Sequence, residues 1–336
     1  MKGKRPTVPD FDPTAGPPIA VLDDESSAGA GGGRPTAYSE ELLRFGGDVS
    51  RETPVITPLP KPATPRVLAV SNQKGGVGKT SSAVNLAAAL AEGGLTVLVI
   101  DMDPQGNAST ALGIDRHADA MMGVYDVLVA DRPLLRTVRP CPDVPDLWVA
   151  PATIDLAGAE IELVAIERRE FRLREALDRL RQQLARNRIG APDYVLIDCP
   201  PSLGLLTLNA LVAADEVVIP IQCEYYALEG LTQLIRTVGL VQASLNPSLG
   251  LGAILLTMYD GRTRLAAQVA EEVRTHFPDT VLRATIPRTV RISEAPSYGQ
   301  SVVTYEPNGV GAHSYREAAR ELAQRAAAKS QEGERA

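Results

Sequence analysis

The chain of 336 residues is poor in cysteine, with only Cys141, Cys199 and Cys223. Three widely spaced cysteines exclude a disulfide scaffold and provide no zinc-ligand spacing, so we expect a reducing cytoplasm as the location. The apolar runs reach only about ten residues, which is too short to cross a bilayer. The N-terminus also lacks the charged, apolar and small-residue order of a secretory signal, so we expect neither secretion nor a membrane span.

Lysine is also scarce, and its positions are uneven. Most of the 34 basic residues are arginine, and between residues 66 and 328 the only lysines are Lys74 and Lys79. An ammonium is a compact point charge and a guanidinium is a planar fork, so the two side chains do different work. The pattern therefore draws attention to these two positions. The net charge of -7 argues against a chain that is basic throughout, but it leaves a local basic patch open.

The composition divides the chain into three parts. Residues 1–65 are rich in proline and glycine and predict a disordered arm, because such a segment buries too little apolar surface to offset its ordering entropy. Residues 66–328 have the pattern of a folded domain. The polar residues 329–336 predict a frayed tail.

Strand and helix patterns alternate in the folded part, which predicts an α/β fold. Short apolar runs predict five strands, at Val67–Ser71, Val97–Ile100, Tyr194–Ile197, Val217–Ile221 and Ala253–Leu256. Helical spacing is seen at Thr80–Glu92, Phe171–Leu184, Leu228–Val241 and Leu265–His276. Because the strands are continuously apolar, both faces of the sheet should be buried. We therefore expect a mostly parallel sheet flanked by helices.

A glycine-rich segment between the first strand and the first helix is the strongest chemical signal. It reads Gln73-Lys74-Gly75-Gly76-Val77-Gly78-Lys79-Thr80. Glycines let backbone N–H groups converge on phosphate oxygens, and the helix N-terminus adds its dipole. Lys79 would reach the β- and γ-phosphates and the Thr80 hydroxyl would bind Mg²⁺. Gln73 stands where the usual phosphate loop has its first glycine, and Lys74 is an addition.

The segment from Lys74 to Thr80 resembles the deviant phosphate loop (deviant Walker A motif) of the ParA/MinD class of ATPases. Two further segments resemble the switches of the ParA/Soj chromosome-partition proteins, Asp101-Met102-Asp103-Pro104-Gln105-Gly106-Asn107 and Asp198-Cys199-Pro200-Pro201-Ser202-Leu203-Gly204. The stretches at 223–230 and 287–297 match as well. The resemblance covers about residues 66–328 and implies the P-loop NTPase fold with ATP and Mg²⁺ as cofactors.

The family resemblance implies roles for individual residues at the nucleotide. ATP would contact Lys74, Gly75, Gly76, Val77, Gly78, Lys79, Thr80 and Ser81. Asp103 would orient the attacking water. Asp101 would lie nearer the magnesium shell, together with Thr80 and Asp198. Asp198 ends a buried strand and needs a positive partner, which a hydrated Mg²⁺ would supply.

Three further roles concern parts outside the phosphate loop. Lys74 would reach across an ATP-bound homodimer to the partner's nucleotide, in the manner of an arginine finger. The backbone N–H of Gly204 would sense the γ-phosphate. Adenine would lie near Pro287 and the loop after the fifth strand. Arg262 and Arg291 match arginines that contact DNA phosphates without sequence preference.

The resemblance implies a weak ATP hydrolase that partitions a chromosome or plasmid and is stimulated by a ParB-type centromere-binding protein. It also implies a cytoplasmic, nucleoid-associated location. A MinD-like membrane regulator is an alternative. It would need a C-terminal amphipathic helix with bulky apolar residues, whereas the apolar residues of Arg316–Gly333 are Leu322 and alanines. A small-molecule kinase and an ATPase that positions another cargo are further alternatives.

Overall fold

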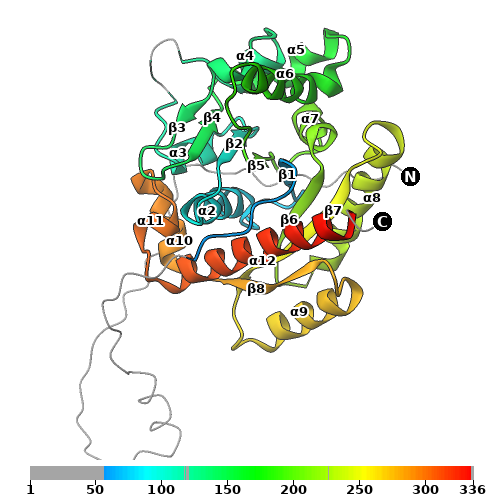
Figure 1. Cartoon of the computed structure of the whole chain (residues 1–336). Helices are drawn as coiled ribbons and strands as arrows, with labels where there is room; N and C mark the ends of the chain where they lie inside the picture. The colour runs from blue at the N-terminus through cyan, green and yellow to red at the C-terminus, as the bar shows by residue number, and fades with distance from the viewer. Residues whose placement is uncertain (1–56, 117, 119–120, 226, 334–336) are drawn as a thin grey trace, which may run out of the picture. The chain divides into compact units, whose positions relative to one another are not determined.

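A single eight-stranded sheet forms the centre of the protein in the computed structural model, which describes residues 57–333 except 117, 119–120 and 226. The strands are β1 (Arg66–Val70), β2 (Val97–Asp101), β3 (Arg139–Pro140), β4 (Leu147–Ala150), β5 (Tyr194–Asp198), β6 (Glu216–Gln222), β7 (Gly250–Tyr259) and β8 (Val281–Pro287). Their order is β3-β4-β2-β5-β1-β6-β7-β8, and only the β3–β4 pairing is antiparallel. The prediction of a mostly parallel sheet flanked by helices is confirmed (Figure 1).

Helices cover both faces of this sheet. One face carries α4 (Val124–Leu128), α5 (Leu156–Glu162), α6 (Arg172–Arg186), α7 (Leu205–Ala213), α8 (Ala227–Ser244) and α9 (Arg264–His276). The other carries α2 (Lys79–Glu92), α3 (Asn107–Ala111), α10 (Val290–Glu294), α11 (Val302–Tyr305) and α12 (Val310–Gly333). Short 3-10 helices lie at Leu134–Arg136, Leu163–Ala165, Arg169–Phe171 and Ala295–Tyr298.

The central strand β1 shows why the strands are apolar without alternation. Val67 and Ala69 point into the core beneath α4–α9, whereas Leu68 and Val70 point into the core beneath α2 and α12. All four are at most 1% exposed. Successive side chains of a strand face opposite sides, so a sheet covered on both sides needs an apolar residue at every position.

The five predicted strands are β1, β2, β5, β6 and β7, and the four predicted helices are α2, α6, α8 and α9. Strands β3, β4 and β8 were not predicted. β3 has only two residues, and β8 is an edge strand with polar and partly exposed positions at Arg283, Ala284 and Thr285. An edge strand needs less apolar surface than a central one, so β8 lacks a continuous apolar run.

Both ends of the predicted domain continue further than the sequence indicated. The predicted disordered arm falls mostly on residues 1–56, outside the described residues. Residues 57–65 have no helix or strand, but Leu59 donates its backbone N–H to Gly93 O at 2.9 Å and packs on the core. The tail predicted to fray from Lys329 continues α12 as far as Gly333. The Lys329 ammonium lies 2.8 Å from Glu216 Oε1.

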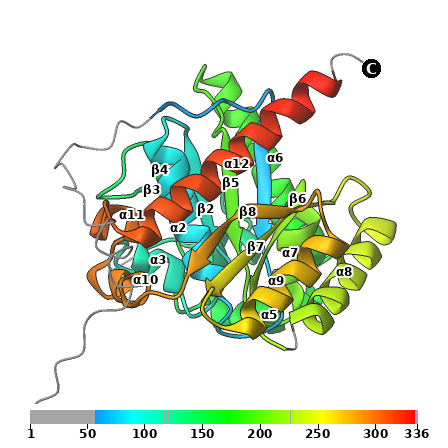
Figure 2. The same cartoon turned by 90° about the horizontal axis from the view of Figure 1, so that it is seen from below.

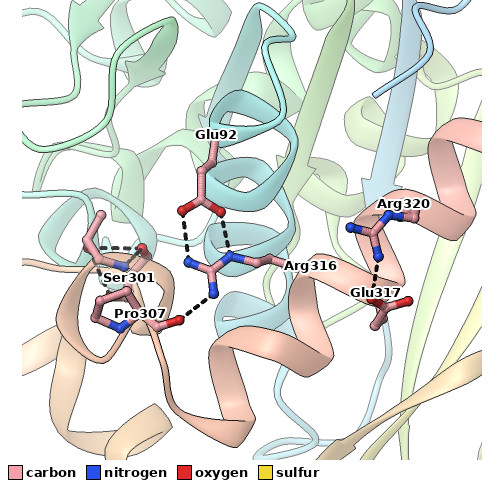
Figure 3. Close-up of polar contacts among 7 residues, drawn as sticks. Glu92, Ser301, Pro307, Arg316, Glu317 and Arg320 are labelled. Atoms are coloured by element: carbon pink, nitrogen blue, oxygen red, sulfur yellow. Dashed lines mark hydrogen bonds and ion pairs between the residues drawn. The ribbon is translucent and has the colours of Figure 1, made fainter. Parts of the chain in front are cut away.

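An ion pair links α12 to α2. On this face of the sheet α12 packs across α2 and β8 (Figure 2). The Arg316 guanidinium binds Glu92 with two parallel hydrogen bonds, Nε to Oε2 at 2.6 Å and Nη2 to Oε1 at 2.8 Å, and also contacts Pro307 O (Figure 3). The side chains are only 12% and 22% exposed. A bidentate, mostly buried pair of this kind holds two helices in one register.

We expect Arg316→Ala to lower the free energy of unfolding by about 2–3 kcal/mol, because it leaves Glu92 half-enclosed without its partner. The matched control is Arg320→Ala, four residues along the same helix, whose pair with Glu317 is 37% and 62% exposed (Figure 3). An exposed pair is screened by water, so that change should cost about 0.5 kcal/mol or less. Urea unfolding curves measure both, and equal losses would contradict this account of α12.

Candidate functional site

The ends of three neighbouring strands bring together residues that are far apart in the sequence. Asp198 at the end of β5 lies in register with Val70 of β1 on one side and with Asp101 of β2 on the other. The carboxyl ends of parallel strands meet at one edge of a sheet, which is where α/β folds bind ligands. The loop from Lys74, the carboxylates of Asp101 and Asp103 and the carboxylate of Asp198 therefore share one edge.

The loop between β1 and α2 has the conformation of an anion cradle. Gly76 and Gly78 have φ angles of 75° and 83°, a left-handed conformation that other residues rarely adopt. Gly78 precedes α2 without a side-chain cap, so the first N–H groups of that helix are directed at the loop. A Cβ atom at Gly75 or Gly76 would meet no atom within 4 Å. The loop therefore leaves room for phosphate oxygens close to its backbone.

Two residues that the sequence analysis missed hold this loop in place. The Asn72 amide donates to Pro220 O at 2.8 Å, and its Oδ1 accepts from the Lys74 N–H at 3.0 Å. The Thr257 hydroxyl on β7 donates to Val77 O at 2.8 Å. Thr257 is 180 residues from its partner, so no local spacing could have indicated it.

The two lysines of the loop have different surroundings. Lys79 is 7% exposed, and its Nζ donates to Lys74 O at 2.9 Å. Burial lowers the pKa of Lys79, and the nearby carboxylates of Asp198 and Asp103 oppose that shift. Lys74 is 45% exposed and its ammonium pairs with Glu224 in the loop before α8. One ammonium is thus inside the cradle and the other on the surface.

Asp198 has the most unusual surroundings in the site. Its side chain is fully buried, and neither carboxylate oxygen accepts a well-formed hydrogen bond from the described residues. Burial, and then the charge of Asp101, raise the pKa of Asp198 well above its ordinary value, while Thr80 and Lys79 act in the opposite direction. A buried carboxylate without a partner is costly, and a cation would remove that cost. The residues present therefore fit a divalent ion at this position.

Oxygen donors of this kind suit Mg²⁺, which takes one or two carboxylates together with water and phosphate oxygens. Over the described part of the chain, no group of three or more His, Cys, Asp or Glu side chains is arranged to hold a metal by itself. A Mg²⁺ ion here would need the Thr80 hydroxyl and ligands from outside the protein in addition to Asp198.

Asp101 and Asp103 are held by different hydrogen bonds. Asp101 Oδ2 accepts from the Ser109 N–H at 2.8 Å and from its hydroxyl at 2.6 Å, and Oδ1 accepts from the Asp103 N–H at 3.2 Å. Burial raises the pKa of Asp101 to about 6. Asp103 uses only Oδ1, which accepts from the Gln105 N–H at 3.0 Å. Within the described residues its Oδ2 accepts no hydrogen bond.

The remaining nucleotide candidates are Gly204 before α7, Pro287 at the end of β8 and Ser81 in α2. Gly204 immediately precedes α7, where a Cβ atom would collide with the Glu160 carboxylate. Pro287 ends β8, three strands away from β1. Ser81 lies in the first turn of α2, and its carbonyl accepts from the Asn85 amide at 2.7 Å. The roles of these residues remain predictions.

Arg262 lies in the loop after β7, and Arg291 lies in α10, just after β8. The two segments leave the sheet side by side, because Tyr259 of β7 is in register with Pro287 of β8. The Arg262 side chain is 91% exposed and Arg291 is 53% exposed. Both already have carboxylate partners. Nearby are Arg264, the first residue of α9, and Arg288, which the sequence analysis did not select and which have no ion-pair partner among the described residues.

Comparisons with known proteins agree with this geometry. A family model described as "AAA domain" matches residues 65–251. The sporulation initiation inhibitor protein Soj of Bacillus subtilis is 53% identical over 258 residues, which are 77% of this chain and 98% of that protein. The chromosome partitioning protein ParA of Myxococcus xanthus is 52% identical over 266 residues, covering 79% of this chain and 90% of its own.

The chain belongs to the ParA/Soj family of chromosome-partitioning ATPases.

Solved structures extend the ParA/Soj comparison to the fold. One solved structure is that of cobyrinic acid a,c-diamide synthase from Mycobacterium smegmatis with bound ADP and magnesium. It is 40% identical to this chain and has a TM-score of 0.64. The match covers 77% of this chain and 94% of that one. The septum site-determining protein MinD of Pyrococcus horikoshii, complexed with Mg-ADP, is 27% identical, with a TM-score of 0.62 over 79% and 99%. The predicted P-loop fold is confirmed.

The ParA/Soj relatives match this chain more closely than the MinD structure does, which favours the first prediction over the MinD-like alternative. Within the described residues, no helix combines the length and the apolar character that a membrane crossing requires.

Proposed function

We propose that this protein binds Mg-ATP, dimerises around it, coats DNA without sequence preference and hydrolyses ATP slowly until a ParB-type partner stimulates it. This cycle would segregate a chromosome or plasmid in the cytoplasm, on the nucleoid. The observation that carries the proposal is Asp198, a fully buried carboxylate without a well-formed hydrogen bond from the described residues, beside a glycine cradle that holds a buried lysine. A metal–nucleotide complex would supply a cation for Asp198 and phosphate oxygens for Lys79.

The cradle from Gly75 to Gly78 and the N-terminus of α2 would hold the phosphates, and the Lys79 ammonium would exchange Lys74 O for a phosphate oxygen. Thr80 and Asp198 would hold the Mg²⁺ ion. When bound, the ion neutralises charge that develops on the phosphate oxygens. Asp103 would hold the attacking water with its unused Oδ2, while Asp101 and Ser109 keep the loop of Asp103 in position.

Dimerisation is supported by the contrast between the two lysines. Lys79 is enclosed by its own chain, whereas Lys74 is on the surface and pairs with Glu224. A surface ammonium directly before the cradle is placed to reach a second nucleotide, as the ParA/Soj resemblance implies. Each site would then be complete only in the dimer, which would couple dimerisation to ATP.

Binding to DNA is supported by the arginine-rich loops after β7 and β8. They lie at the carboxyl edge of the sheet, the edge of the cradle, so a dimer closed over nucleotide would bring two sets together. One subunit offers few phosphate contacts against a net charge of -7, so the dimer should bind far better.

The DNA surface can be tested by binding to two unrelated duplexes over a salt series, with ATP and with ADP. We expect binding only with ATP and equal affinity for both sequences. Arg262→Ala combined with Arg291→Ala removes up to four contacts per dimer. At about 0.9 per phosphate, the slope of log affinity against log salt should flatten by roughly 3 to 4.

The matched control is Arg168→Ala combined with Arg181→Ala, which removes the same charge beside and on α6. Its slope should stay near that of the wild type. An unchanged slope in the Arg262, Arg291 variant would place the DNA surface elsewhere, and tight binding with ADP would separate DNA binding from the nucleotide.

A further inference from the structure

Arg262, which is 91% exposed on the proposed DNA surface, is held by its own loop. Asp260 Oδ1 accepts from the Nε of Arg262 at 2.9 Å, and Oδ2 accepts from Nη2 at 3.0 Å. The backbone N–H of Arg262 donates to the same Oδ1 at 3.1 Å. Thr263 then begins α9 as its N-cap. The turn from Asp260 to Thr263 therefore positions a carboxylate against one edge of the guanidinium.

This edge is the part of an arginine that recognises phosphate. A guanidinium binds a carboxylate or a phosphate with the same two parallel N–H donors, and the two ligands compete for them. Arg262 lowers the pKa of Asp260, so this carboxylate stays charged at neutral pH. A DNA phosphate can take the Nε and Nη2 donors of Arg262 only after Asp260 has released them.

The second predicted DNA contact has the same arrangement with different residues. Nη1 of Arg291 donates to Glu294 Oε2 at 3.0 Å, and its Nε lies 3.5 Å from Glu306 Oε1. The guanidinium carbon is 6.0 Å from the centre of the Tyr305 ring. Two carboxylates and an aromatic ring therefore surround this guanidinium before any DNA arrives.

The balance of charge in the two segments that carry these arginines is close to neutral. Residues 259–264 and 288–306 contain four arginines, Arg262, Arg264, Arg288 and Arg291, and three carboxylates, Asp260, Glu294 and Glu306. Removing one carboxylate would double the net positive charge of the surface in each subunit. The acidic side chains thus have a large effect on how strongly this surface attracts a polyanion.

We propose that Asp260 and Glu294 act as internal competitors of DNA phosphate and keep the affinity of each subunit low. The inference rests on the proposed DNA surface and deepens it. A subunit that must break its own ion pairs binds DNA weakly, and a dimer combines two weak surfaces into useful affinity. When the dimer separates, the carboxylates recapture the arginines and DNA is released.

The test is the affinity of the ATP-bound protein for a mixed-sequence duplex, with Asp260→Asn as the main variant. Asparagine can still accept the backbone N–H of Arg262, so the turn is kept, but it no longer binds the guanidinium as an ion pair. Because the pair is exposed, its loss should change the affinity only modestly, by roughly threefold to fivefold per subunit. Two subunits should therefore bind about tenfold more tightly, and the salt slope should steepen by about 2. Glu294→Gln provides a second variant with the same expected direction.

The matched control is Asp178→Asn on α6, which breaks a similarly exposed pair with Arg181 and changes the charge equally. Its affinity should change less than about twofold. An equal gain in this control would overturn the inference. Wild-type affinity in both Asp260→Asn and Glu294→Gln, measured while Arg262→Ala still weakens binding, would also overturn the inference but would leave the proposed DNA surface in place. Wild-type binding by Arg262→Ala combined with Arg291→Ala would overturn the proposed surface itself.

Discussion

Replacing Asp103 with alanine is expected to slow ATP hydrolysis by about 10²- to 10⁴-fold while nucleotide and Mg²⁺ still bind. Asp103 is 7% exposed and keeps Oδ2 without a hydrogen bond from the described residues, so this oxygen can hold a water molecule. The cradle, Lys79 and Asp198 do not depend on it for their positions. With its water no longer held, the protein should remain as the ATP-bound dimer and stay on DNA.

Phosphate release measures the rate, and size-exclusion chromatography with light scattering measures the dimer. Asp103→Asn keeps the shape of the side chain and should also be slow, because an amide is a poor proton acceptor. Asp279→Ala removes an exposed carboxylate before β8 and serves as the control. Hydrolysis at the wild-type rate in the Asp103 variants would show that another group positions the water.

The second large effect is expected from replacing each of the two loop lysines, Lys79 and Lys74, in turn. Lys79→Ala should weaken ATP binding by roughly 100-fold or more, because it removes a buried charge that would face the phosphates. The structure supports this role, since Lys79 is enclosed and donates to the loop carbonyl that a phosphate would replace. Lys74→Ala should bind ATP with nearly normal affinity but fail to form the dimer, because its charge would serve the partner's nucleotide.

Titration with a fluorescent ATP analogue measures the affinity, and light scattering with ATP measures dimerisation. Lys61→Ala is the control, since Lys61 is an exposed lysine paired with Asp193 away from the cradle. An equal loss of ATP affinity in the Lys74 and Lys79 variants would contradict the division of roles. Normal dimerisation of Lys74→Ala would do so as well.

The sequence revealed the strands whose residues all have the same buried environment. β1, β2 and β5 are buried on both faces, so apart from Arg66 at the start of β1 and the aspartates that end β2 and β5 they have no charged residue, and each strand is visible as an apolar run. β4 and β8 were missed because their environments change from residue to residue. Trp148 of β4 is 41% exposed between buried neighbours, which interrupts the pattern.

The candidate site divides in a similar way. The glycine loop, its lysines and the carboxylates after β2 and β5 are local patterns, because each follows directly from a strand end and from backbone conformation. Ser109, Asn72 and Thr257 hold these groups from elsewhere, and nothing beside them in the sequence indicates it. Their importance depends on hydrogen bonds that exist only after folding.

The sequence by itself determined a parallel α/β nucleotide-binding domain, because strand burial and loop geometry are encoded over a few consecutive residues. The ParA/Soj type was indicated by the resemblance of its motifs. Only the tertiary structure decided how the charges are matched. It left Asp198 without a well-formed hydrogen bond from the described residues, enclosed Lys79 and put Lys74 against Glu224. It also paired Arg262 with Asp260 and Arg291 with Glu294. Charge pairing depends on distances of a few ångströms between side chains, and folding sets those distances.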